Sequence, residues 1–584
     1  MKKHEDVCKI SFVMKEILLC SLNSKFIHSS LAAHSIKAAY DYYGKTLPKE
    51  EQDCLPTLTV CEFTINDSYQ SVLYHITNKR PYAVCFSVYL WNVRFVSALC
   101  KDIKACFPDC IIILGGPEVS FGVDNAFFSE DMYDYVIEGE GEKSFFALFS
   151  QLNDTSLAAS AEDFRISQNG KVIKAQTAVV LDNLPFVYNR ENIALFENRI
   201  VYYESSRGCP FSCAYCLSSA EHGVRFLSLE RVFEDLKFFI ENDIPLVKFV
   251  DRTFNCNKKR SYEIIKYIIE NNKNTCFHFE VAADLFDAET LSLLRTAPRG
   301  RIQFEIGIQS TNEKALKASC RAIDNTKVFE NIKVLTSMRN INIHADLIAG
   351  LPYEGYADFA ETFNETYAFC TDEDSYIHQL QIGFLKLLHG APLNNMIETH
   401  GYAFSKNPPY QVLCNSYLSC DELNLLLGFE DVFERYYNSG RFHKTLCYLA
   451  TENCAFASPF AFYTALAEFY RSRGLLFTGV SSRRMYDVFV EFLENFYSQD
   501  DMIKIKALLL YDYFASDSSD LPPESLRCLW KSERHYKKEA YAVLEAAGKI
   551  SDKENTVRFI GEQAFIFNYS AKNPVTDRFD ESIK

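Results

Sequence analysis

Ser205-Ser206-Arg207-Gly208-Cys209-Pro210-Phe211-Ser212-Cys213-Ala214-Tyr215-Cys216 is the stretch that decides how this sequence is interpreted. Its three cysteines, spaced Cys-x3-Cys-x2-Cys, directly follow the apolar run Val201–Ser205, which predicts a β-strand. Gly208 and Pro210 interrupt regular structure, so the cysteines are expected on a loop. Three thiols in one short loop after a strand indicate a metal centre.

The number of thiols bears on the kind of metal centre. A four-iron cluster has four iron corners, so three thiolates leave one corner open unless a distant fourth cysteine closes it. Open positions are typical of reactive metal sites. Zinc is the alternative, but structural zinc sites pair two short-spaced ligand couples, and Cys414/Cys420 and Cys447/Cys454 have the wrong spacing. The triplet therefore favours a 4Fe-4S cluster with an open iron.

The region around the triplet, residues 199–388, alternates short apolar runs with helical stretches. This pattern predicts six βα repeats, a partial (β/α)6 barrel of the TIM type. The expected strands are Val201–Ser205, Leu246–Val250, Phe277–Ala282, Ile302–Ile308, Ile341–Ile348 and His378–Phe384.

Residues 1–150 show the same alternation and predict a doubly wound parallel α/β sheet, whose ligands bind beyond the carboxyl ends of the strands. Residues 151–198 are interpreted as a connector, and residues 389–584 as a mainly helical accessory domain ending in a strand pair within Arg558–Tyr569. The amino-terminal strands are expected at Glu16–Cys20, Leu58–Phe63, Ala83–Val88, Ile111–Leu114 and Tyr135–Ile137.

Composition narrows the class of protein. The chain has 61 Lys and Arg against 77 Asp and Glu, a net charge of −16, and shows no basic stripe of the kind that binds nucleic acid. Its 20 cysteines are spread through apolar stretches, which indicates reduced thiols and a cytoplasmic protein. The first residues lack the apolar core of a signal peptide, and no apolar run reaches 18 residues, so no membrane partner is expected.

A cysteine triplet at the end of the first strand of a six-fold barrel resembles the radical S-adenosylmethionine (SAM) superfamily. The resemblance implies that Cys209, Cys213 and Cys216 hold the cluster, whose open iron chelates the amino and carboxylate groups of SAM. An electron from the cluster then breaks a carbon–sulfur bond of SAM and yields a 5′-deoxyadenosyl radical. The resemblance places Tyr215 near the adenine.

Further SAM-binding residues implied by the resemblance end successive strands. Arg321 lies twelve residues beyond Gln309 and takes the position of a basic residue near the SAM carboxylate, which its planar fork suits. Related enzymes usually carry a Gly-Gly-Glu-like segment after strand two, and this chain has none there. A lone polar residue at a strand end can equally cap the next helix. The recurrence of polar residues at the ends of successive strands favours a shared ligand. The remaining candidates are Asp251, Thr253, Glu280 and Asp346.

A flavodoxin-like domain ahead of such a barrel resembles the cobalamin-binding branch of the superfamily. Gly115 and Gly116 would let a flat macrocycle or its nucleotide tail approach the backbone. The Asp-x-His-x-x-Gly signature of an axial cobalt ligand is absent, so either His28 or no side chain ligates cobalt. The cobalamin residues implied by the resemblance are Asn23, His28, Ser87, Tyr89, Gly115, Gly116, Glu118, Glu138 and Gly139.

The resemblance implies a cobalamin-dependent radical SAM enzyme that methylates an unactivated carbon of a small-molecule or peptide substrate. Methylcobalamin would deliver the methyl group, a second SAM would recharge the cobalt, and flavodoxin or ferredoxin would donate electrons. One alternative is a ring rearrangement, cyclisation or oxidation with the same cofactors. Another is a non-catalytic iron–sulfur electron carrier or cobalamin-binding protein. A methylthiotransferase acting on transfer RNA is disfavoured, because Cys8, Cys20 and Cys54 do not form a second cluster motif.

Overall fold

The fold is described from a computed structural model, which covers residues 15–581 except 54, 124–125, 154–163, 167–170, 176–177, 221–222, 371–377, 451–453, 520, 532–536, 548, 550–554 and 573–577. The chain forms two compact units. One comprises residues 1–205, 225–235 and 406–409, and the other comprises residues 206–224, 236–405 and 410–584.

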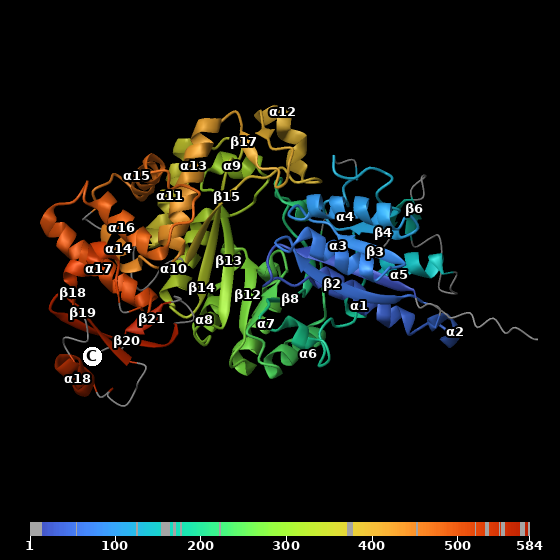
Figure 1. The fold of residues 1–584 in the computed structure, drawn as a ribbon, viewed down its shortest axis with the longest axis horizontal. Helices are drawn as coiled ribbons and strands as arrows, with labels where there is room; N and C mark the ends of the chain where they lie inside the picture. The colour runs from blue at the N-terminus through green and yellow to red at the C-terminus, as the bar shows by residue number, and fades with distance from the viewer. Residues whose placement is uncertain are drawn as a thin grey trace, which may run out of the picture. The chain divides into compact units, whose positions relative to one another are not determined.

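The first unit is built on a seven-stranded sheet of order β2-β1-β3-β4-β5-β7-β6 (Figure 1). All neighbouring strands run parallel except β6 and β7, which form a hairpin at one edge. The strands are β1 (Glu16–Asn23), β2 (Thr57–Thr64), β3 (Ala83–Ser87), β4 (Ile111–Gly115), β5 (Tyr135–Glu138), β6 (Phe164–Ile166) and β7 (Val172–Ala175). The predicted doubly wound sheet is confirmed, and residues within 151–198 extend it.

Two apolar cores cover opposite faces of this sheet. One contains residues of α3 (Tyr69–Asn78) and α4 (Val93–Cys106), and the other contains residues of α1 (Leu31–Gly44) and α5 (Gly141–Leu152). Strands buried on both faces must be apolar throughout, which is why β1 and β4 read as nearly continuous hydrophobic runs. The short helix α2 (Lys49–Gln52) follows α1.

A second sheet has six strands in the order β15-β14-β13-β12-β11-β8, so the predicted partial barrel is confirmed as an open parallel sheet (Figure 1). Its strands are β8 (Val201–Tyr203), β11 (Leu246–Phe249), β12 (Cys276–Val281), β13 (Ile302–Gln309), β14 (Asn342–Ala349) and β15 (Gln379–Phe384). The connecting helices are α6 (Leu229–Glu241), α7 (Lys258–Asn271), α8 (Ala288–Leu294), α9 (Glu313–Ala318), α10 (Asn325–Ser337) and α11 (Tyr356–Tyr367).

The carboxyl-terminal part is mainly helical, as predicted, and ends in a small antiparallel sheet that includes the expected strand pair. No helix in the described ranges has both the length and the apolar character to cross a membrane. The longer helices are α13 (Cys420–Phe433), which continues into the π-helical turn η8 (Glu434–Asn438), α15 (Pro459–Ser472), α16 (Ser482–Leu493) and α17 (Gln499–Ser516); the strand pair is β19 (Asn555–Ile560) and β20 (Gln563–Lys572).

Candidate active site

The cysteine loop begins in the short strand β9 (Ser206–Cys209), which pairs with β10 (Gly223–Phe226). Gly208 has φ +100°, and a Cβ at this position would lie 2.1 Å from the carbonyl oxygen of Gly223. A residue with a side chain would therefore push the two strands apart. The glycine that the sequence places before Cys209 allows the loop to turn away from β10.

Backbone hydrogen bonds fix the middle of this loop. The Ala214 amide donates to the Ser319 carbonyl at 2.8 Å, and the Ala214 carbonyl accepts from the Leu393 amide at 2.8 Å. The Cys216 amide donates to the Cys213 carbonyl at 3.0 Å, which closes a turn between two of the cysteines. The three thiols are thus carried by a loop held in place from two distant parts of the chain.

Arg321 connects this loop to the end of β13. Its Nη1 lies 3.8 Å from the Cys213 sulfur and 3.3 Å from the Tyr215 hydroxyl, and its Nη2 donates to the Gly307 carbonyl. Burial raises the pKa of Tyr215 well above its usual value, so its hydroxyl is neutral. The guanidinium therefore links the cysteine loop to the end of β13.

The side chains of Gln309 and Arg321 both lie against Gly307. A Cβ on Gly307 would lie 2.2 Å from the Gln309 Nε2, so these two side chains need the space that this glycine leaves. Gln309 has φ +70°. Its Oε1 and the Arg321 Nε are buried without a hydrogen-bond partner among the described residues. An unused acceptor and an unused cationic donor at one strand end match an amino acid's ammonium and carboxylate groups.

The turn after β13 rests on a buried carboxyl group. The Ser310 hydroxyl donates to the Glu354 Oε1 at 2.5 Å, and the Thr362 hydroxyl donates to the same oxygen at 3.3 Å. Burial raises the pKa of Glu354 to about 7. Neither Ser310 nor Glu354 was predicted as a site residue, and only the fold brings them together.

Asp251 and Thr253, after β11, lie against the start of the cysteine loop. The Ser206 hydroxyl donates to the Asp251 Oδ2 at 2.6 Å, and the Thr253 hydroxyl lies 3.5 Å from the Cys209 sulfur. Asp251 is buried, so this bond ties the end of β11 to β9. The structure thus brings both residues to the cysteines, with Thr253 close enough to contact whatever Cys209 ligates.

Glu280 and Asp346 lie on neighbouring parallel strands on either side of β13. Glu280 is paired in register with Glu305, and Asp346 is paired with Gly307. Burial raises the pKa of Glu280 to about 7, and its carboxyl has no hydrogen-bond or ion-pair partner in the described part of the chain. Asp346 lies 3.1 Å from the His344 Nε2.

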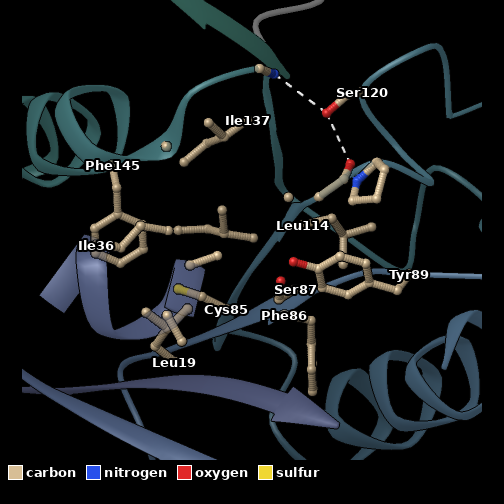
Figure 2. Close-up of a pocket in the computed structure, with 18 residues that line it drawn as sticks. Leu19, Ile36, Cys85, Phe86, Ser87, Tyr89, Leu114, Ser120, Ile137 and Phe145 are labelled. Atoms are coloured by element: carbon tan, nitrogen blue, oxygen red, sulfur yellow. Dashed lines mark hydrogen bonds between the residues drawn. The ribbon is translucent and has the colours of Figure 1, made fainter. Parts of the chain in front are cut away.

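The first unit has a cavity of about 240 Å³ at the carboxyl ends of β3, β4 and β5 (Figure 2). Five of the nine predicted cobalamin residues line it, namely Ser87, Tyr89, Gly115, Gly116 and Gly139. The Ser120 hydroxyl donates to the Gly116 carbonyl at 2.9 Å and accepts from the Gly139 amide at 3.3 Å, so it joins two loops across the cavity.

Gly116 closes one wall of this cavity against β3. It has φ +103°, and a Cβ there would lie 2.6 Å from the Val88 carbonyl oxygen. On the neighbouring loop, the ring of Tyr89 stacks on that of Trp91, with centroids 4.4 Å apart and 6° between the planes. The glycine backbone at Gly116 and the flat ring of Tyr89 together form a slot that suits a planar ligand group.

The other four predicted cobalamin residues are not among those lining this cavity. The Asn23 amide donates to the His28 carbonyl and to Glu62, and the His28 Nδ1 lies 2.6 Å from the Tyr202 hydroxyl. Glu118 is buried, and Glu138 lies 3.8 Å from the Lys174 Nζ. Cobalamin contacts by these four residues stay predictions.

The sequence reasoning missed the apolar part of this cavity. Its inner wall comes from strands and helices, including Leu19, Ile36, Ile137 and Phe145 (Figure 2). Their alternating apolar pattern predicted burial and could not separate a cavity wall from a packed core. Ser120 carried no signal either, because its role depends on two loops that only the fold brings together.

Both sites lie in parts of the chain that match known domain families. Residues 203–366 match the radical SAM superfamily, residues 25–149 match the B12 binding domain, and residues 398–567 match a protein family of unknown function, DUF4080. The chain joins a B12-binding domain to a radical SAM domain. The cysteine loop, Gln309, Arg321 and Asp346 lie within the radical SAM match, and the cavity residues lie within the B12-binding match.

Individual proteins resemble more than half of this chain. The chain is 22% identical over 376 residues to the 2-(S-pantetheinyl)-carbapenam-3-carboxylate methyltransferase of Streptantibioticus cattleyicolor, covering 59% of this chain and 52% of the relative. It is 24% identical over 354 residues to the cobalamin-dependent radical SAM methyltransferase TokK of Streptomyces tokunonensis, covering 55% and 50%. The chain therefore spans about half the length of these relatives.

Among solved structures, the cobalamin-dependent SAM radical enzyme OxsB with aqua-cobalamin bound superposes with a TM-score of 0.58 at 14% identity. The match covers 88% of this chain and 83% of that one. At this identity the likeness concerns the fold, and it extends through the B12-binding and radical SAM domains into the carboxyl-terminal region.

Proposed function

We propose that this protein is a cobalamin-dependent radical SAM methyltransferase that methylates an unactivated carbon of a small-molecule or peptide substrate. The observation that carries the proposal is the site at the end of β13. There Arg321 contacts the cysteine loop, while its Nε and the Gln309 Oε1 are buried without a partner in the part of the chain that the structure describes. The relatives' methyl transfer supports the reaction type.

The residues present fit a 4Fe-4S cluster and SAM. Cys209, Cys213 and Cys216 would ligate three irons and leave the fourth for SAM. Arg321 would pair with the SAM carboxylate, and the Gln309 Oε1 would accept from its amino group. Thr253 lies beside Cys209, and Tyr215, Glu280, Asp251 and Asp346 complete the set proposed to surround the nucleoside and methionine parts.

The cavity of the first unit fits a planar group of cobalamin. Gly115, Gly116 and Gly139 line the cavity with backbone atoms that no side chain of their own covers, and Ser87 and Tyr89 add hydroxyl groups. A volume of about 240 Å³ holds only part of so large a cofactor, so the nucleotide tail is the part we place there. We also propose Asn23, Glu118 and Glu138 as contacts, and either His28 or no side chain as the ligand of cobalt.

When bound, the cluster and SAM supply a 5′-deoxyadenosyl radical that removes hydrogen from the substrate, and cobalamin supplies the methyl group. The protein's own residues bind and orient these groups. Arg321 is held by the Gly307 carbonyl and the Tyr215 hydroxyl, so its free Nε has a fixed direction. The Ser310–Glu354 bond steadies the turn that carries Gln309. Such positioning places reacting groups without further reorganisation.

The test is anaerobic reconstitution with iron, sulfide and cobalamin, followed by incubation with deuteromethyl SAM, flavodoxin or ferredoxin as electron donor, and a metabolite extract of the encoding organism. We expect 5′-deoxyadenosine together with a product that carries the deuterated methyl group. Formation of 5′-deoxyadenosine with an unlabelled, rearranged or oxidised product would refute methyl transfer. Failure to cleave SAM despite a full cluster would favour an electron carrier or cobalamin-binding protein. A cytoplasmic location stays a prediction.

A further inference from the structure

The two faces of the sheet β11–β15 differ sharply in chemistry. On β13 and β14 every second residue is an apolar side chain that is fully buried, such as Phe304 and Leu347. The alternate positions, which point to the opposite face, are mostly polar or charged. We call this opposite face the polar face; it comprises Lys248, His278, Glu280, Gln303, Glu305, Asn342, His344, Asp346, Gln379 and Gln381.

Strand register arranges the polar face in rows across the sheet. One row contains Lys248, His278, Gln303 and Asn342, and the next contains Glu280, Glu305, His344 and Gln379. The third row contains Gly307, Asp346 and Gln381. Since a strand rises roughly 3.3 Å per residue, Glu305 lies about 13 Å below Gln309 on the same face. The polar face therefore leads directly to the proposed SAM site.

Closed TIM barrels fill the corresponding interior with layers of branched apolar side chains. Covering polar groups with a packed apolar layer would cost free energy unless each found a partner. A face with this composition is therefore suited to water or to a ligand that hydrogen-bonds.

In the described part of the chain, Glu305 on this face forms ion pairs and the neighbouring Glu280 forms none. Glu305 lies 2.9 Å from both the Lys248 Nζ and the His278 Nε2. Although burial alone would raise it, these two partners hold the pKa of Glu305 well below its usual value. Glu280, next to it in the row, has no such partner within the described ranges.

The DUF4080 match contributes a wall to the same face. Its π-helical turn η8 lies at the free edge of β15, where the Asn438 side chain accepts from the Leu380 amide at 2.9 Å and donates to the Leu380 carbonyl at 3.0 Å. Two bonds to one residue cap an edge strand that would otherwise be open to pairing. The Asn438 amide also donates to the Glu434 Oε1 at 2.6 Å.

Glu434 and Glu430 lie one helical turn apart on this wall. Burial raises the pKa of Glu434, and the hydrogen bond from Asn438 and the charge of His344 on β14 act against this rise. The Glu430 carboxyl has no hydrogen-bond or ion-pair partner among the described residues, and burial and the neighbouring Glu434 and Asp431 raise its pKa to about 7. The carboxyl-terminal region thus places Glu434, and Glu430 one helical turn before it, next to the edge of β15.

We propose that the polar face, completed by Glu430 and Glu434, binds the substrate of the reaction, and that this substrate is a polar, neutral or cationic molecule. The inference rests on the proposed function, since it names the substrate class of that site. Five carboxyl groups (Glu280, Glu305, Asp346, Glu430 and Glu434) outnumber the four basic side chains near them, Lys248, Arg252, His278 and His344. A polyanion would be repelled by this balance, and a lipid would leave the polar groups without partners.

The experiment uses the reconstituted full-length protein with deuteromethyl SAM and an extract of the encoding organism divided into three fractions. These are the chloroform phase, the aqueous material retained by an anion exchanger, and the aqueous flow-through. We expect the deuterated methyl group in a flow-through product. A labelled product confined to the chloroform phase or to the retained anions would overturn the inference while leaving methyl transfer intact. Label in no fraction, with 5′-deoxyadenosine formed, would instead refute the proposed function and this inference with it.

A variant then ties the substrate to the wall. Glu434→Gln keeps the size of the side chain and removes its charge. We expect it to raise the KM for the substrate in the fraction that becomes labelled about tenfold. Glu468→Gln is the matched control and should leave KM unchanged. Glu468 is an exposed residue of the same region whose ion-pair partner among the described residues is Arg471. Equal KM values for both variants, with cluster and cobalamin contents equal to the parent's, would place the substrate elsewhere.

Discussion

Gly116→Ala should weaken cobalamin binding more than its effect on backbone strain alone explains. Gly116 has φ +103°, a conformation that costs a residue with a side chain about 1–2 kcal/mol. An added Cβ would also lie 2.6 Å from the Val88 carbonyl oxygen and 2.9 Å from its amide nitrogen. The loop after β4 and the end of β3 would have to separate.

The size of the effect follows from the bonds at that junction. The Val88 amide donates to the Gly115 carbonyl at 2.7 Å, and the Glu118 amide donates to the Val88 carbonyl at 3.3 Å. Each bond is worth about 1 kcal/mol net, so separation adds about 1–2 kcal/mol to the strain. Gly115 and Gly116 line the cavity, so this distortion should weaken cobalamin binding about 5–30-fold.

Gly122→Ala is the matched control. Gly122 has φ +108°, and a Cβ there would meet no atom within 4 Å. It therefore carries the same backbone strain without the close approach, and it does not line the cavity. Cobalamin affinity is measured by anaerobic equilibrium dialysis with absorbance detection, and iron content confirms that the radical SAM domain is intact. If both alanine variants bind cobalamin equally well, the reasoning about Gly116 is refuted.

Three further predictions concern the second unit. Cys213→Ala should lower iron from about four per chain to near zero and abolish 5′-deoxyadenosine formation, which iron analysis and chromatography check; retained iron would contradict it. Arg321→Lys should raise the KM for SAM about tenfold because an ammonium group cannot replace the guanidinium fork; a KM within twofold of the parent's would contradict it. Burial raises the Glu354 pKa to about 7, so folding favours the neutral form and the free energy of unfolding falls as pH rises from about 5 through 7. Glu354→Gln should flatten this dependence by up to about 3 kcal/mol in denaturant titrations, and an unchanged slope would contradict it.

The two parallel sheets could be predicted because their signal is local. The predicted strands that begin at Leu58, Ala83 and Ile111 lie within one residue of the observed bounds, since strands buried on both faces must be apolar throughout. The strand predicted from Glu16 begins at the observed residue but was expected to end three residues too early. The spacing of the cysteine triplet and the Gly115-Gly116 pair are likewise features of a few consecutive residues. Local sequence sufficed for the fold class and for the proposed cluster loop.

Contacts between distant segments could not be predicted in this way. Arg321 was selected through a family resemblance, and only the structure brings its guanidinium to Cys213, a residue 108 positions earlier. Ser206 with Asp251, and Ser310 with Glu354, are pairs whose members carry no signal in their own neighbourhoods. Such pairs depend on which strands become neighbours and in which register, and both are set by packing of the whole sheet.

The chain's local patterns of apolar residues, glycines and cysteines determined two α/β domains and the loop proposed to carry a cluster. Tertiary structure alone decided which polar groups at the end of β13 have no partner among the described residues, which five residues of nine reach the cavity, and that Asn438 links Glu434 to the edge of β15. The physical reason is that periodicity reports only whether a side chain is buried. Its partner is chosen by the parallel register of strands that lie tens of residues apart along the chain.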